Sequence, residues 1–197
     1  METVPKDVVE LMTNDLLPQE LVNFCISNIH PNVKQLCNDN AFWVRRYNKD
    51  FRYFATIHFD DLNTNAKQRY LQLFTLVSRE AEFAAEYILN LYGDIKKFLT
   101  KEYKDNLYNY FFRHIIEIFE EISDLRNTDR DDIIDWYVAW SGAHRNYDYF
   151  KNKFIPVFGH DADDEYNDDS LWQNSLDYVM SEAIMKIGKA LDLYDGE

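Results

Sequence analysis

Apolar residues recur three or four positions apart along almost the whole chain, and this spacing restricts the fold more than any other feature. The clearest examples are residues 73–91 and 107–125, where the apolar positions stay on one helical face. No segment alternates apolar and polar residues as a half-buried strand would, and no Asn-Gly or Asp-Gly pair joins two apolar runs. The sequence therefore predicts an all-α fold.

Prolines and polar pairs mark short helices in the first quarter of the chain. The pair Asn14-Asp15 should end a first helix, and Pro18 should open a second. Pro31 should end the second helix, because its ring is not tolerated inside a helix. A short third helix should reach Cys37, and the next apolar segment follows it directly.

The rest of the chain carries longer helical patterns. One stripe should end before Gly93, which suits a helix C-terminus. Near the C-terminus, Ser170 and Gln173 have the spacing of a capping box, which predicts that a last helix starts at Ser170 and runs to about residue 191. We expect a short helical module over residues 1–56 and a helical C-terminal domain over residues 57–197.

The net charge of −14 excludes several classes of ligand. Residues 157–197 alone hold two basic and eleven acidic residues, so the acidity belongs mainly to the C-terminal domain. Nucleic acids normally need a basic footprint, and so does an anionic membrane surface. No stretch approaches the ~20 apolar residues of a membrane span. We therefore expect neither nucleic acid nor membrane as a partner.

Only two cysteines occur, Cys25 and Cys37, which is too few for a disulfide framework. Two free thiols suit a reducing compartment, and Cys25 on an apolar helix face is expected to be a small core residue. The acidic N-terminus, METVPKDVVELMTNDLL, does not resemble a signal peptide. These features predict an intracellular protein, in the cytoplasm.

The sequence offers no strong cofactor or metal site. The five glycines form no phosphate-binding pattern. The alternating acids Asp161, Asp163 and Glu165 suggest a calcium loop, but Tyr166 stands where such a loop needs glycine and Trp172 where it needs glutamate. We therefore expect no cofactor and no metal.

Residues 4–53 resemble an F-box, the short helical module that connects substrate receptors to cullin–RING ubiquitin ligases. The run Val4-Pro5-Lys6-Asp7-Val8-Val9 is similar to the start of the family motif. The middle is similar in Leu21-Val-Asn-Phe-Cys-Ile-Ser-Asn28, and the close in Val33-Lys-Gln-Leu-Cys-Asn-Asp-Asn-Ala-Phe-Trp-Val-Arg-Arg-Tyr47. This order looks most like the F-box-like proteins of large DNA viruses, which would place the protein in the host cytoplasm.

The resemblance implies a non-catalytic adaptor that binds a Skp-type linker through its N-terminal helices and an unknown target through residues 57–197. The residues expected to contact the linker are Val4, Pro5, Val8, Leu16, Leu17, Pro18 and Leu21. Phe42 and Trp43, followed by Arg45 and Arg46, suit a helix with one buried face, and the two aromatic residues should anchor the module to the rest of the chain.

Three alternatives stay open at this point. All these apolar residues could be the core of an ordinary helical bundle. The chain could also be a structural or virion-associated interaction protein that never meets a ligase. Finally, His144 with Asp131 and Asp135 could serve as the acid–base set of a small hydrolase, although a solvated corner between helices explains the same residues. Of these hypotheses we favour the adaptor, and we therefore expect that the protein is not an enzyme.

Overall fold

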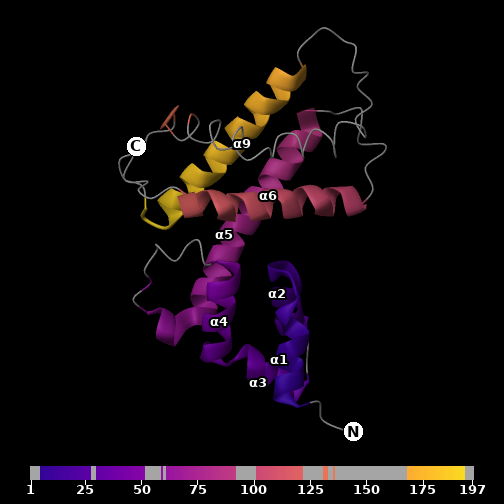
Figure 1. Cartoon of the computed structure of the whole chain (residues 1–197), viewed down its shortest axis with the longest axis vertical. Helices are drawn as coiled ribbons and strands as arrows, with labels where there is room; N and C mark the ends of the chain where they lie inside the picture. The colour runs from indigo at the N-terminus through magenta and orange to yellow at the C-terminus, as the bar shows by residue number, and fades with distance from the viewer. Residues whose placement is uncertain are drawn as a thin grey trace. The chain divides into compact units, whose positions relative to one another are not determined.

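The computed structural model describes residues 5–27, 30–51, 59, 61–91, 101–121, 131–132, 135 and 168–193. In this part of the chain every regular element is a helix, which confirms the all-α prediction there (Figure 1). The helices are α1 (Lys6–Asn14), α2 (Pro18–Ser27), α3 (Pro31–Cys37), α4 (Asn40–Asp50), α5 (Leu62–Leu91), α6 (Lys101–Glu121) and α9 (Asp168–Ala190). None of these described helices is long and apolar enough to cross a membrane.

Local chemistry marks the start of α4 and of α3. The Asp39 carboxylate accepts a hydrogen bond of 3.0 Å from the Ala41 amide at the start of α4. Pro31 is the first residue of α3, where its missing N–H costs nothing. The sequence predicted that Pro31 would end the second helix; α2 is described as far as Ser27, and residues 28–29 lie outside the described residues.

The last helix starts earlier than its expected capping box. Helix α9 begins at Asp168, so Ser170 lies inside its first turn and the predicted N-cap is wrong. The acidic pair Asp168-Asp169 lies at the positive end of the helix dipole, where negative charge is favourable. Residues 122–125 of the second stripe, Gly93, and the acids Asp161, Asp163 and Glu165 lie outside the described residues.

The chain divides into two compact units, residues 1–76 and 77–197, and the division falls within α5 and not after residue 56. The first part of α5 is bonded to α4, which explains the later boundary. The Asn40 side-chain amide donates to the Asn63 carbonyl (2.6 Å) and accepts from the Ala66 amide (2.9 Å). Helix α5 bends at Asn65, which lies between these two contacted residues.

The first unit packs α1–α4 and the start of α5 around an aromatic core. Its fully buried large side chains are Leu21, Leu36, Phe42, Trp43, Tyr47, Phe51, Tyr70 and Leu73. The Phe51 and Tyr70 rings meet edge to face, with centroids 5.0 Å apart. A core of interlocked rings fixes the relative positions of these short helices, none of which could be stable alone.

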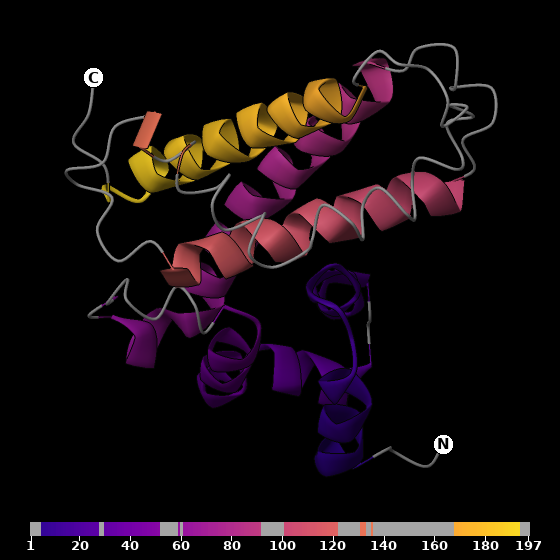
Figure 2. The same ribbon diagram turned by 45° about the horizontal axis from the view of Figure 1, so that its top comes forward.

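The second unit packs the later part of α5 with α6 and α9. Helices α5 and α9 run side by side in opposite directions, because Tyr87 contacts Tyr178 while the earlier Glu80 contacts the later Lys186 (Figure 2). Ser78 and Tyr108 share a hydrogen bond of 2.8 Å between α5 and α6. The core consists of apolar side chains at helical spacing, among them Val77, Ala81, Ile88, Leu107, Phe111, Ile115, Val179, Met180, Ile184 and Ile187.

Candidate interaction site

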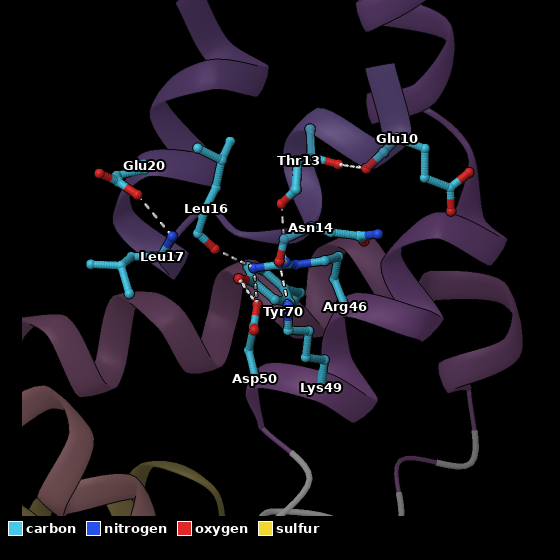
Figure 3. Close-up of polar contacts among 10 residues, drawn as sticks. All are labelled: Glu10, Thr13, Asn14, Leu16, Leu17, Glu20, Arg46, Lys49, Asp50 and Tyr70. Carbon is cyan, nitrogen blue, oxygen red and sulfur yellow. Dashed lines mark hydrogen bonds and ion pairs between the residues drawn. The ribbon is translucent and has the colours of Figure 1, made fainter. Parts of the chain in front are cut away.

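A buried arginine on α4 holds the turn between α1 and α2 (Figure 3). The Arg46 guanidinium donates to the carbonyls of Thr13 (3.2 Å), Asn14 (3.2 Å) and Leu16 (2.9 Å). Carbonyls at the end of a helix lack partners within the helix, and a cation there also suits the negative end of its dipole. Arg46 therefore caps α1 from outside and ties the α1–α2 turn to α4.

The charge of this arginine is balanced inside the same unit. The Asp50 carboxylate lies 2.6 Å from the Arg46 guanidinium, and both side chains are almost fully buried. The Tyr70 hydroxyl of α5 donates to the same carboxylate over 2.7 Å. Burial raises the pKa of Asp50, while Arg46 and Tyr70 act in the opposite direction. We call Arg46, Asp50 and Tyr70 the Arg46 cluster.

The tyrosine of the Arg46 cluster stays a hydrogen-bond donor across the physiological pH range. Burial raises the pKa of Tyr70, and the neighbouring Asp50 raises it further. A neutral hydroxyl can satisfy the buried carboxylate without adding a second charge. The cluster thus links α4 and α5 to the turn after α1.

Helix α1, held in this way, presents large apolar side chains to solvent. Leu11 is 67% exposed and Met12 is 64% exposed, and Val8 is also exposed. Leu11 and Met12 follow Val8 by three and four positions, so the three residues share one face of α1, whereas Val9 and Thr13 face the core. We call Val8, Leu11 and Met12 the α1 stripe.

The residues that were expected to contact a linker differ in their exposure to solvent. The exposed ones are Pro5, Val8 and Leu17, and the half-buried ones are Leu16 and Pro18. Leu21 is fully buried, so the expectation that it is available to a partner is wrong. It shares the inward face of α2 with Val22. Val4 lies outside the described residues.

Sequence reasoning missed two members of the α1 stripe. Leu11 and Met12 were not among the expected contacts, although their spacing from Val8 already placed all three on one face. One exposed large apolar residue, Ile26, also lies on α2. The signal that identifies the stripe is therefore helical spacing from Val8, and not the family motif.

The expected anchor pair lies in the core of the first unit. Phe42 and Trp43 are each about 1% exposed, and their rings meet edge to face at 5.4 Å. The Trp43 ring packs against Tyr70 with centroids 4.9 Å apart, and its indole N–H donates to the Cys37 carbonyl over 2.8 Å. Trp43 thus contacts α3 through its N–H and α5 through its ring.

The two cysteines are joined to each other. Cys25 on α2 and Cys37 at the end of α3 form a disulfide, with their Cα atoms 5.7 Å apart. The expectation that the two cysteines are unpaired is wrong, because the packing of α2 and α3 brings them together. The argument for a reducing compartment relied on unpaired cysteines, so it no longer holds.

Breaking this disulfide should lower the free energy of unfolding by about 3 kcal/mol, because the bond closes a short loop in the unfolded chain. The expected readout is urea denaturation of the protein with and without dithiothreitol. The variant Cys25→Ser should match the reduced protein and should not respond to the reductant. Equal stability of the oxidised and reduced protein would show that the bond contributes nothing.

The set proposed for a hydrolase is not assembled in the described residues. Asp131 and Asp135 are exposed, and His144 lies outside the described part of the chain. Among the described residues, no group of three or more His, Cys, Asp or Glu side chains could hold a metal ion. The described residues therefore offer no geometry that supports the acid–base reading.

Comparison of the chain with protein-family models, curated proteins and solved structures gives no match. Its function is therefore inferred from its own residues. Among these, the α1 stripe and the Arg46 cluster that holds the end of α1 form the clearest candidate site. An exposed apolar helix face on a fixed backbone is typical of helix-mediated docking, where a few spaced side chains enter a partner's groove.

Proposed function

We propose that the protein is a non-catalytic adaptor that docks a partner protein through the α1 stripe. In keeping with the F-box resemblance of residues 4–53, we propose a Skp-type linker of a cullin–RING ubiquitin ligase as that partner. Residues 57–197 would then hold a target. Such an adaptor needs no reactive group of its own, because it acts by bringing its target close to an enzyme.

The observation that carries this proposal is the exposure of Val8, Leu11 and Met12 on one face of a helix that is fixed by buried contacts. Burying a leucine or methionine side chain is favourable by about 1.5–3 kcal/mol. Apolar groups at this spacing suit a groove on the partner, as in other complexes that recognise one face of a helix.

The charges around the stripe indicate which charges the rim of the partner's groove should carry. Asp7 is exposed in the first turn of α1, and Asp15 is exposed directly after the last residue of α1. Like charges at the rim of a groove would oppose docking, whereas basic residues would favour it and speed association. A linker with an apolar groove and basic rim residues is the expected partner.

The main alternative is a structural or virion-associated protein that uses the same stripe without any ligase. Both functions would use the same exposed side chains, so the identity of the partner distinguishes the adaptor from the structural protein. Binding of a purified Skp-type linker supports the adaptor. Self-association through the stripe, with no linker binding, supports the alternative.

Replacing Leu11 by aspartate should reduce capture of a purified Skp-type linker by more than about tenfold, because a carboxylate without a partner is heavily penalised in an apolar groove. The measurement is a pull-down with immobilised adaptor, followed by calorimetric titration. Since Leu11 is exposed, the free energy of unfolding should change by no more than about 0.5 kcal/mol.

Asn48→Asp is the matched control, because Asn48 is exposed on α4 and the change adds the same charge to the same unit. It should leave linker capture unchanged. The assay is run with and without dithiothreitol, since a cytoplasmic adaptor meets thiol reductants. Full linker binding by Leu11→Asp, or no binding by the unchanged protein in either condition, would refute the proposal.

A further inference from the structure

An aromatic surface on the second unit is the strongest feature that the docking proposal does not use. Phe83 and Tyr87 on α5 and Tyr178 on α9 form a row of rings, with neighbouring centroids 6.3 and 5.5 Å apart. Phe83 and Tyr178 are both exposed although they are large and aromatic. Rings of this kind supply much of the binding energy in protein contacts.

Two exposed acidic residues lie close to Phe83 along α5. Glu82 and Glu86 are exposed on α5 and stand one turn apart, next to Phe83 in the sequence and three residues beyond it. We call Phe83, Tyr87 and Tyr178, with Glu82 and Glu86, the aromatic–acidic face. Its charge has the same sign as the unit around it, which contains the strongly acidic C-terminal segment.

The face already accommodates one cation that belongs to the protein itself. The Lys186 ammonium lies 4.4 Å from the centre of the Phe83 ring. The same ammonium is 3.7 Å from the Glu80 carboxylate and 4.0 Å from that of Glu182. An aromatic ring and carboxylates together are the surroundings that favour a lysine or arginine side chain.

We propose that the aromatic–acidic face binds a short basic segment of a partner protein, with lysine or arginine side chains lying on the rings and pairing with Glu82 and Glu86. Charge complementarity selects this occupant over an acidic peptide or a nucleic acid, which the same carboxylates repel. The inference deepens the proposed function, because it names the chemistry of the target that the adaptor would hold.

The contact is small, so its affinity should be modest and sensitive to salt. Exposed ion pairs are individually weak, and salt screens them over about 8–10 Å at physiological ionic strength. Lys186 competes with the incoming side chain for the Phe83 ring and for the Glu182 carboxylate. Removing the charge of Lys186 should therefore strengthen binding of a basic segment. A merely structural role for Lys186 does not predict this result.

The test uses the full chain and a fluorescein-labelled peptide that alternates Lys and Arg with Gly and Ser, read by fluorescence anisotropy. Glu82→Gln combined with Glu86→Gln should weaken binding about 3- to 10-fold, and Phe83→Leu should weaken it about 3- to 5-fold by removing the ring while keeping apolar bulk. Lys186→Met should tighten binding about 2- to 5-fold.

A control must distinguish binding at this face from the general electrostatic attraction of an acidic protein for a basic peptide. Asp105→Asn combined with Asp131→Asn removes two exposed charges of the same unit that belong to neither α5 nor α9. This pair should change the affinity less than about twofold. An effect equal to that of the Glu82 and Glu86 pair would overturn the proposal, as would equal binding of a peptide with Gln in place of Lys and Arg.

Two further outcomes would also overturn the inference. Weaker binding after Lys186→Met would show that Lys186 does not compete with the ligand. A dimer in solution that Phe83→Leu dissociates would assign the face to a second copy of the chain. Linker capture, measured on the same variants, should be unchanged, so failure of this inference and failure of the docking proposal are distinguishable.

Discussion

Replacing Asp50 by asparagine should lower the free energy of unfolding by about 3–5 kcal/mol, because it leaves the charge of Arg46 buried without its counterion. The two side chains are only 3% and 8% exposed, so water cannot take over the role of the carboxylate. Urea denaturation followed by circular dichroism measures this change. Hydrogen exchange should also become faster in α1, whose end Arg46 holds.

The adjacent arginine offers a matched control. Arg45 forms an ion pair with Glu10, but its side chain is 54% exposed. The variant Glu10→Gln should cost no more than about 1 kcal/mol, because exposed ion pairs contribute little. If Asp50→Asn costs no more than Glu10→Gln, the Arg46 cluster does not stabilise the unit as described.

A double-mutant cycle identifies the source of the effect. The variants Arg46→Met and Asp50→Asn act on groups in direct contact, so their combined cost should fall short of the sum by about 1–3 kcal/mol. An additive result would mean that the two side chains stabilise the unit independently. Tyr70→Phe removes only one donor to the carboxylate and should cost about 1–3 kcal/mol.

Truncating Trp43 to alanine should cost about 3–5 kcal/mol, because it removes a fully buried indole from between α3, α4 and α5. Trp43→Phe is the graded control. It keeps a ring against Tyr70 and loses the hydrogen bond to Cys37, so it should cost less than the truncation. In urea denaturation read by circular dichroism, the free energy of unfolding should be highest for the unchanged protein and lowest for the alanine variant. An alanine variant as stable as the unchanged protein would contradict the assignment of Trp43 to the core.

The existence of the helices followed from the sequence, because caps, prolines and apolar spacing agree with each other. The helix termini at Asn14 and Pro18 lie at the polar pair and the proline that predicted them. The start of α9 was misplaced because Ser170 offers a capping pattern while Asp168 and Asp169 also suit a first turn. Local patterns of this kind compete, and the sequence alone does not rank them.

Burial within the candidate site depends on tertiary contacts that spacing cannot supply. Arg45 and Arg46 are adjacent and identical, yet one is exposed and the other is buried. The difference arises because the carbonyls of the α1–α2 turn lie within reach of Arg46. Leu11 and Leu21 differ in the same way, since one faces solvent and the other faces the core.

The disulfide was missed for a related reason. Cys25 and Cys37 lie on different helices, and their distance depends on how α2 and α3 pack. A count of two cysteines excludes a framework of several bonds, but it does not exclude one bond. Pairing is decided by the distance between the Cα atoms, which the sequence does not contain.

The external cap that Arg46 places on α1 also bears on the entropy of association. Because the end of the helix is fixed by folding, a partner that binds the α1 stripe does not have to order its backbone, which would cost about 1–2 kcal/mol per residue. Only side chains such as Leu11 and Met12 lose freedom, at about 0.5–1.5 kcal/mol each. The buried cation thus makes α1 a preorganised ligand for any partner that takes the α1 stripe.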